Sequence, residues 1–467
     1  MSRAGPCVPA VLLGLWAGAV ALSTRIEMSL ALASPLLILP LLWWLLTGAR
    51  NWLAGFLGAA ILLPPLPIAL GNSGPHPSLL FAVAGGWIGT IRLREWRINI
   101  DPVGQAMLVF SSVLLASVAC AALYSGSGIA AGSLARVLLF AISVYTYLFS
   151  TVGPGAGNSR KTARIFRLLL AVAFLAAVFA CIDFYYQLPA PAGYGAQFVW
   201  LDSGVFRRAQ GLFYEASTLG NFCAFFLVMI AALGSEKRGA RMASGPLLAI
   251  AGTVVASALV FSYSRASIAA LGCALIALLF LRRGTSGLRR WIILVPFSFA
   301  AAGTLVFLVF PEFAQIYWLR MRASAEFFLE EPNRILSGRL ESWKTIGNML
   351  MEHPRYLLLG IGYKTLPYSD LAGGPVVADN MYLSLLVETG LPGLLAFLWL
   401  NVEIIRAGHR AACAGSLFGT WIFCFWIGEM VQMLSGDLFT YWRVLPLYFW
   451  VLAQAVREGG SGEHSVR

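Results

Sequence analysis

Long apolar runs separated by short polar segments dominate the chain. A run of about 20 such residues is long enough to cross roughly 30 Å of hydrocarbon as an α-helix. Length and hydropathy predict spans at about 7–23, 30–46, 52–70, 79–91, 103–123, 134–151, 164–186, 213–233, 246–262, 266–281, 291–310, 381–403, 415–434 and 438–455. The run at 79–91 is short and also fits a re-entrant segment. The prediction is therefore an all-α polytopic membrane protein with about 12 to 14 transmembrane helices.

Basic residues orient these spans, because cytoplasmic loops carry an excess of Lys and Arg. Alternate loops hold the clusters: Arg92, Arg94 and Arg97; Arg160, Lys161 and Arg164; Lys237, Arg238 and Arg241; Arg282, Arg283, Arg289 and Arg290; Arg406 and Arg410. The loops at 71–78, 124–133 and 435–437 contain neither Lys nor Arg. This alternation places both termini in the cytoplasm and favours a retained first helix over a cleaved signal peptide. It also places segments 187–212, 262–266 and 311–380 outside.

The composition limits which kinds of ligand and cofactor we expect. The 467 residues are 59% hydrophobic and 12% charged, whereas a soluble domain carries roughly 25% charged residues. The net charge of +12 is explained first by basic loops that set the topology and second by an anionic ligand. The sequence lacks the basic soluble face that nucleic acid binding would need, so this function is not expected. The seven cysteines form no C-x-x-C pair and no Cys/His cluster, so we interpret them as small core residues. Without paired acidic metal motifs or a Walker loop, we expect neither a metal nor a nucleotide cofactor.

Arginines on the outer side break the charge rule and mark a candidate anion site. Arg265 lies in the tight turn Ser262–Ser267, and Arg208 precedes Glu215 at the mouth of a span. The planar guanidinium matches phosphate oxygens in bidentate fashion, which suits a lipid-linked pyrophosphate at the membrane surface. The alternative is interfacial snorkelling or an internal ion pair, for instance with Asp183 or Glu215.

The long outer segment has structure of its own. From Ser337 to Lys344 a helix begins, with apolar residues at Trp343, Ile346, Met349, Leu350 and Met351. This spacing predicts an amphipathic helix at the membrane surface that ends at His353-Pro354. Turns are expected at Gly360–Gly362 and at Ala372–Pro375.

Carboxylates follow this segment. Asp379 starts the span at 381–403, where it either caps the helix or acts as a general base. The helix dipole stabilises its charge and weakens it as a base, whereas burial would oppose that effect. Glu388 and Glu429 lie inside spans and are functional suspects for that reason, while Asp437 is interpreted as an exposed loop residue.

Together these motifs resemble the O-antigen ligase and polymerase superfamily of bacterial envelope glycosyltransferases, over roughly residues 200–450. The similarity runs through Ser337-Gly338-Arg339, Trp343, His353-Pro354, Gly360-x-Gly362, Asp379-Asn380 and Gly390-x-x-Gly393, and includes the S-x-S-R turn at Arg265. The resemblance implies transfer of a glycan from undecaprenyl pyrophosphate to an acceptor hydroxyl on the periplasmic face of the inner membrane, as in lipopolysaccharide biosynthesis. Ligases of the family use lipid A–core as acceptor, and polymerases use another carrier-linked glycan, so a polymerase of O-antigen or exopolysaccharide is the alternative.

The resemblance also implies roles for residues. Family arginines grip the pyrophosphate, which points to Arg265 and Arg208. A family histidine before the Asn is thought to activate the acceptor, and here that position is Asp379. This departure is compatible with a carboxylate base, with a different acceptor or with an inactive homologue. The expected catalytic residues are Asp379 and Arg265, and the expected substrate-binding residues are Arg208, Arg265, Glu215, Arg339, Asn380 and Tyr382.

The predicted units are N-terminal helices at 1–186, central helices with the arginine motifs at 187–310, the extracytoplasmic loop 311–380, C-terminal helices at 381–455 and a cytoplasmic tail at 456–467. The expected partners are the lipid-linked donor, a glycan, lipid or protein acceptor, and membrane lipids. The rival from another class is a transporter of an anionic solute. A transporter would show paired broken helices at the membrane midplane and inverted repeats, whereas the polar groups here gather at one surface.

Overall fold

The structure is a computed structural model of the chain. It describes residues 40–66, 75–156, 159–235, 245–282 and 338–463, except 42, 46, 98, 191–193 and 202–203, together with Trp16 and isolated positions between 300 and 322. The predicted spans at 7–23 and 30–46 lie wholly or mostly outside the described residues. So do the predicted span at 291–310 and most of the outer segment before Gly338.

Helices make up most of the described chain. They are α3 (Asn51–Leu62), α4 (Ser78–Ile91), α5 (Pro102–Ser125), α6 (Ser127–Thr151), α7 (Ser159–Tyr186), α8 (Ala216–Ser235), α9 (Gly245–Phe261), α10 (Arg265–Leu281), α14 (Arg339–Glu352), α15 (Arg355–Leu359), α16 (Met381–Cys413), α17 (Leu417–Gln432) and α18 (Leu445–Glu463). Among the described residues, α5, α6, α7, α8 and α16 are long and apolar enough to cross a membrane, and α3, α4, α9, α10 and α17 are shorter apolar helices. The predicted all-α polytopic fold is confirmed.

Some helix ends differ from the hydropathy estimates, because turn and capping residues set them. Gly126, at φ +86°, alone separates α5 from α6, so the predicted loop 124–133 is otherwise helical. The last predicted span starts at Leu445 instead of 438, since Leu438–Thr440 forms a 3-10 turn (η5) capped by Asp437.

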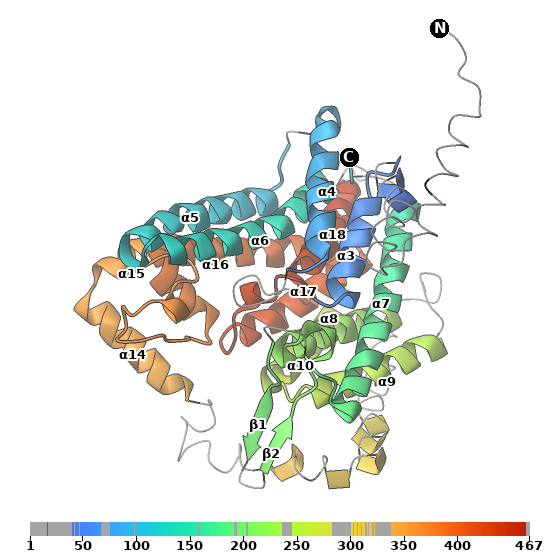
Figure 1. Ribbon diagram of the computed structural model, residues 1–467. Coiled ribbons are helices and arrows are strands. Elements are labelled where there is room, and N and C mark those ends of the chain that lie inside the picture. Colours follow the sequence, from blue (N-terminus) through green and yellow to red (C-terminus); the bar gives the residue numbers. More distant parts are fainter. Residues whose placement is uncertain are drawn as a thin grey trace.

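The helices pack into one bundle (Figure 1). In it, α5 lies along α6 and α16, α10 packs on α17 and α8, and α18 contacts α6, α16 and α17. Helix α8 is the most enclosed of the long apolar helices, with 83% of its most apolar window buried. Its middle therefore faces protein instead of lipid.

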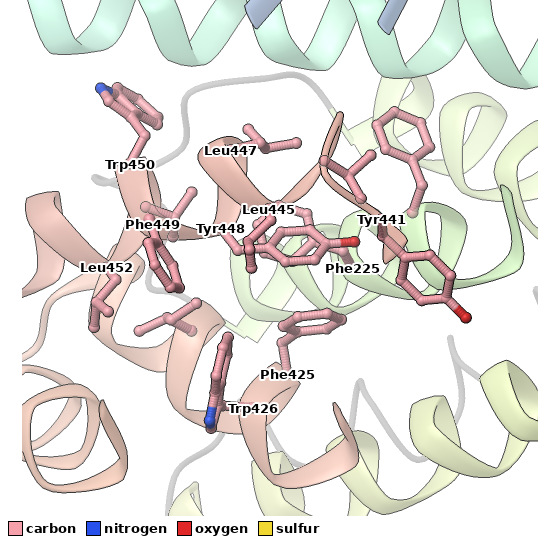
Figure 2. Packing of buried hydrophobic residues seen from close by; sticks show 14 of the residues in the cluster. Phe225, Phe425, Trp426, Tyr441, Leu445, Leu447, Tyr448, Phe449, Trp450 and Leu452 are labelled. Atoms are coloured by element: carbon pink, nitrogen blue, oxygen red, sulfur yellow. The ribbon is translucent and has the colours of Figure 1, made fainter. Parts of the chain in front are cut away.

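Aromatic side chains fill the space between α8, α17 and α18 (Figure 2). The ring of Phe225 lies 4.3 Å from Trp421, 4.7 Å from Phe425 and 4.4 Å from Tyr448, measured between centroids. Tilted and edge-on pairs of this kind add to the free energy gained by burying the rings. The three helices are thus held together by ring packing around Phe225.

A buried polar cluster lies beside these rings. Asn221 on α8 donates to the Glu429 carboxylate of α17 and accepts from the Tyr448 hydroxyl of α18. None of the three side chains is exposed. Polar groups inside a bundle need such partners, because no water is available to them.

Helix α16 is broken within its length. Gly390 has φ +69° and ψ −172°, and Pro392 has no N–H to donate to the helix. The carbonyl of Glu388, which an N–H at position 392 would otherwise reach, accepts instead from Gly362 N at 2.8 Å. The segment Gly360–Gly362, expected to be a turn, bends at Ile361, and backbone N–H groups within it donate to carbonyls at the break of α16.

Glycine is required at both sides of this contact. A Cβ at Gly390 would lie 2.5 Å from the carbonyl oxygen of Leu358, and a Cβ at Gly360 would clash with the carbonyl of Glu388. Both glycines also have positive φ, which residues with a side chain rarely adopt. The two glycine motifs of the sequence thus meet in space and shape each other.

Helix α14 confirms the predicted amphipathic helix, which ends at His353 as expected. Ile346, Met349 and Leu350 are buried, whereas Met351 is 77% exposed. The buried face packs against residues of α15 and α16, among them Tyr356. Met351 therefore does not share the face of α14 that packs against protein.

Candidate functional site

A cavity of about 990 Å³ lies between the segments that carry the sequence motifs. This volume is at the upper end of the range for small-molecule sites. Its charged lining residues are Arg136, Arg208, Glu215, Arg265, Arg339, Lys364, Asp379, Glu388 and Asp437. The structure therefore brings together five of the residues expected from the sequence, which come from separate parts of the chain.

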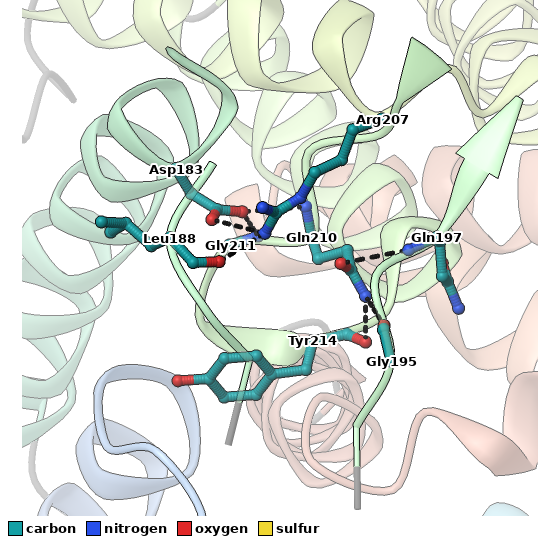
Figure 3. Close-up of polar contacts among 8 residues, drawn as sticks. All are labelled: Asp183, Leu188, Gly195, Gln197, Arg207, Gln210, Gly211 and Tyr214. Carbon is teal, nitrogen blue, oxygen red and sulfur yellow. Dashed lines mark hydrogen bonds and ion pairs between the residues drawn. The ribbon is translucent and has the colours of Figure 1, made fainter. Parts of the chain in front are cut away.

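Arg208 follows a short antiparallel hairpin, β1 (Phe198–Leu201) and β2 (Gly204–Arg207). The buried carboxylate of Asp183 accepts from the guanidinium of Arg207 at 3.3 Å and from the backbone N–H groups of Gln210 and Gly211 at 3.3 and 3.1 Å (Figure 3). Asp183 is thus the partner of Arg207. The alternative that it neutralises Arg208 is wrong.

Gln210 fixes the loop in which it lies through contacts with Gly195 and Tyr214 (Figure 3). The same loop carries Arg208 and Glu215. Gln210 is only 1% exposed, and its amide nitrogen donates to the carbonyls of Gly195 and Tyr214 at 2.9 and 2.8 Å. Glu215 in turn accepts from two hydroxyls of α8, those of Ser217 and Thr218. A buried amide with these contacts holds the loop in one conformation.

Backbone contacts then place Arg208 beside the turn that carries Arg265. The Arg208 Nε donates to the carbonyl of Ser262 at 2.9 Å, and Ala209 N donates to that of Phe261 at 2.9 Å. Burial lowers the pKa of the Arg208 guanidinium, Tyr441 and Glu215 oppose this, and the nearby Arg265 and Arg339 lower it again. Arg208 forms no ion pair with the residues that the structure describes.

The serines of the S-x-S-R turn have structural roles. Ser262 donates to the carbonyl of Leu259 at 2.6 Å, and Ser264 caps α10 by accepting from Ser267 N at 3.4 Å. Arg265 is the first residue of α10, at the positive end of the helix dipole. A cation there is unfavourable by about 0.3–1 kcal/mol, whereas an anion is favoured. Of the turn's polar residues, Arg265 is the one suited to bind an anion.

Asp379 and Arg339 meet at the cavity wall. The Arg339 Nε donates to Asp379 Oδ2 at 3.3 Å, and the Asp379 side chain is half exposed. The residue that caps α16 is Asn380, whose side chain accepts from Leu383 N at 3.0 Å. The alternative that Asp379 caps the helix is therefore wrong, and its carboxylate is available to the cavity.

The other two residues expected at the site do not line the cavity. Asn380 is occupied with the helix cap, and the Tyr382 hydroxyl donates to the carbonyl of Met430 at 3.2 Å. Glu429, expected to be functional because it lies in a span, is likewise absent from the cavity lining. Its contacts are those of the buried cluster with Asn221 and Tyr448.

Sequence reasoning missed the charged residues elsewhere on the wall. Lys364 forms an ion pair with Asp437, whose side chain is only 15% exposed, so its interpretation as an exposed loop residue was wrong. The guanidinium of Arg136 stacks on the ring of Tyr368 at 4.4 Å. One signal was available: Arg136 lies at the predicted outer end of a span, where basic residues are disfavoured.

The segment that contains much of this wall matches a known family. Residues 248–398, less than half of the chain, match the family model described as O-Antigen ligase. A search of the curated proteins finds no match. The matched segment contains Arg265, Arg339 and Asp379, whereas Arg208 and Asp437 lie outside it. The resemblance is therefore confirmed over residues 248–398, which are similar to the O-antigen ligase family.

Proposed function

We propose that the protein transfers a glycan from an undecaprenyl pyrophosphate carrier to an acceptor hydroxyl at the periplasmic face of the bacterial inner membrane. One observation carries the proposal: a single cavity gathers Arg208, Arg265 and Arg339 with the half-exposed carboxylate of Asp379. The guanidiniums suit a diphosphate, and the carboxylate suits an acceptor hydroxyl.

The proposed chemistry is a displacement at the anomeric carbon of the donor sugar. The acceptor oxygen forms the new glycosidic bond and gives its proton to the Asp379 carboxylate. The bond between the anomeric carbon and the pyrophosphate breaks, and the carrier leaves with its electron pair. Arg208 and Arg265 hold the diphosphate and stabilise the charge that develops on it, as fixed cations do in other transfer sites, so no metal is needed for this role.

The acceptor class separates two variants of this function. Delivery to lipid A–core or to another lipid or protein would make the protein a ligase, and delivery to a second carrier-linked glycan a polymerase. Deletion of the gene distinguishes them, because loss of a ligase leaves long lipid-linked chains, whereas loss of a polymerase leaves single repeat units.

The second candidate function is not enzymatic: the protein would transport an anionic solute. The break of α16 at Gly390 favours it, since transporters build their sites at interrupted helices. Uptake of a labelled anion into proteoliposomes tests this function. Transport without any glycan transfer would replace the main proposal.

Arg265 provides the direct test of the main proposal. Arg265→Ala should reduce transfer by about 10²–10³, as removal of one charge-stabilising donor does elsewhere, and should weaken binding of undecaprenyl pyrophosphate. Arg265→Lys should restore only part of both, because Lys lacks the planar fork. The measurement is glycan transfer in membranes of a deletion strain, alongside binding of the carrier to purified protein.

The control for this test is Arg92→Ala. Arg92 lies outside the cavity and pairs with Glu95 on the protein surface, so its loss should leave transfer and binding unchanged. Wild-type transfer by an Arg265→Ala protein that is present in normal amounts would refute the assignment of Arg265.

A further inference from the structure

The charged residues of the cavity fall into two groups. The arginine cluster comprises Arg208, Arg265 and Arg339 with the carboxylates Glu215 and Asp379. The lysine cluster comprises Arg136, Lys364, Glu388 and Asp437, which come from α6, the segment after Gly362, α16 and the loop before η5. The arginine cluster has more cations than carboxylates, whereas the formal charges of the lysine cluster cancel.

An ion pair and a hydrogen bond hold residues of the lysine cluster in place. Lys364 and Asp437 form an ion pair, and Glu388 Oε1 accepts from Leu366 N at 3.3 Å. Lys364 is held at φ +57°, a conformation that costs a residue with a side chain about 1–3 kcal/mol. The ion pair by itself has a structural explanation, because it joins the segment after Gly362 to the loop before η5.

Two buried oxygens at the cavity wall are not accounted for by contacts within the protein. Glu388 Oε2 and Gln432 Oε1 have no hydrogen-bond partner among the described residues, although the two side chains are only 2% and 3% exposed. Both residues line the cavity. A buried acceptor left without a donor costs about 1–3 kcal/mol, so an unpartnered one at a cavity wall indicates a ligand that supplies donors.

The missing donors identify the chemistry of this ligand. An anion is disfavoured, because anions bring further acceptors to oxygens that already lack donors. A neutral ligand rich in hydroxyls fits, since each hydroxyl can donate to Glu388 or Gln432 and accept from Lys364 or Arg136. The cavity wall also contains the rings of Tyr368 and Trp442, against which the apolar face of a sugar ring can pack.

We infer that the lysine cluster together with Gln432 forms a carbohydrate subsite, which binds sugar hydroxyls while the arginine cluster binds the diphosphate. The inference rests on the proposed function and adds to it the residues that contact sugar. The sugar is either the one attached to the donor pyrophosphate or that of the acceptor glycan, and the two sources share the same hydroxyl chemistry.

Two probes that differ only in a sugar test the donor source: undecaprenyl pyrophosphate and the same carrier bearing N-acetylglucosamine. Their dissociation constants are measured on the full-length protein in nanodiscs. Glu388→Gln puts an amide in place of the carboxylate, and Gln432→Met removes an acceptor at similar size. Each should lower the affinity for a sugar that occupies the subsite about tenfold, and leave binding of the bare carrier unchanged.

The acceptor source is tested with free chitobiose on protein saturated with undecaprenyl pyrophosphate. A loss in either variant for the linked sugar assigns the subsite to the donor, and a loss for free chitobiose assigns it to the acceptor. The matched control is Glu403→Gln, a buried glutamate of the same helix α16 that pairs with Arg406 away from the cavity. It should bind all probes as the wild type does.

The failure of this inference is distinct from failure of the proposed function. If Arg265→Ala binds the bare carrier as strongly as the wild type, the proposed function fails. A second outcome refutes the carbohydrate subsite alone. In it, carrier binding depends on Arg265, but Glu388→Gln and Gln432→Met bind both sugar probes like the wild type. Unchanged melting temperatures show that these two variants are folded. Absence of any sugar-dependent binding by the wild type also refutes the subsite.

Discussion

Single residues around the cavity are held in an unfavourable backbone conformation. Tyr263, Lys364 and Asp379 line the cavity with φ of +53°, +57° and +44°. Tyr214, at φ +56°, directly precedes the lining residue Glu215. Left-handed non-glycine residues cost about 1–3 kcal/mol each and cluster at functional sites in other proteins. The fold thus retains strain where we propose that substrates bind.

Asp379 is the residue whose role is most open to experiment. Asp379→Asn keeps the size of the side chain, and Asn tolerates positive φ as Asp does. The helix cap is untouched because Asn380 provides it. We therefore expect an intact protein with normal carrier binding, and a loss of transfer of about 10²–10⁴ if the carboxylate accepts the proton. Transfer and carrier binding are measured on the same preparation.

Near-normal transfer by Asp379→Asn would remove the base role and leave Asp379 as the partner of Arg339. A companion variant, Asp379→His, restores the residue of the family pattern. Transfer by this variant above that of Asp379→Asn would indicate that the surrounding wall still accommodates a histidine base.

Residue types and position relative to the spans were enough to predict part of the site. Arg208 and Arg265 were predicted because basic residues on the outer side need an explanation. Lys364 and Asp437 were missed, since their pairing joins two loops 73 residues apart and depends on how the bundle packs. Tyr382 was expected at the site from its neighbourhood in sequence, but its hydroxyl binds the backbone of α17 instead.

Among the elements, hydropathy predicted where helices lie but not how they are interrupted. The span at 381–403 was expected to be one helix, and the structure shows a helix extended to Cys413 and broken at Gly390. Sequence did reveal both glycine motifs. It could not reveal that they contact each other, because the bend at Gly360–Gly362 and the break at Gly390 become complementary only after folding.

Substitutions at these glycines test the contact. Gly390→Ala and Gly360→Ala should each lower the melting temperature of the purified protein clearly, since each adds a Cβ within about 2.5 Å of a backbone carbonyl and strains a positive φ. The combined variant should lose less than the sum of the two, because both disrupt the same contact.

Gly347 serves as the matched control. It lies within α14, where a Cβ meets no atom within 4 Å. Gly347→Ala should raise stability by about 0.4–1 kcal/mol, because Ala restricts the unfolded chain and favours the helix. A melting temperature for Gly390→Ala equal to that of the Gly347→Ala protein would contradict the proposed contact.

For the whole molecule, the cavity depends on segments that are distant in sequence. It draws on α6, the loop before α8, the turn before α10, α14, α16 and the loop before η5. The family match covers only part of this set, residues 248–398. The remainder of the wall, including Arg136 and Asp437, lies in flanking segments. Residues there are suitable candidates for determining which glycan is accepted.

The orientation of the whole molecule in the membrane can be tested with single cysteines. Asn348 lies on the exposed surface of α14, on the predicted outer side, and native Cys413 is exposed at the far end of α16. In a background without other cysteines, Asn348→Cys should react with an impermeant maleimide in intact cells. Cys413 as the sole cysteine should react only after permeabilisation, because the part of α16 after its break, from Pro392 to Cys413, is about 33 Å long and can cross roughly 30 Å of hydrocarbon. The reverse labelling pattern would overturn the proposed periplasmic site.

The buried cluster of Asn221, Glu429 and Tyr448 has a consequence for biosynthesis. Asn221 precedes Glu429 by 208 residues and Tyr448 by 227, so the ribosome makes the partners at very different times. Helix α8 is therefore made before either side chain that binds the Asn221 amide in the folded protein. A nascent chain that lacks α17 and α18 is therefore an incomplete bundle, with a polar group exposed to lipid that quality-control proteases can recognise. We therefore expect the chain to reach its full stability only after α17 and α18 have packed against α8.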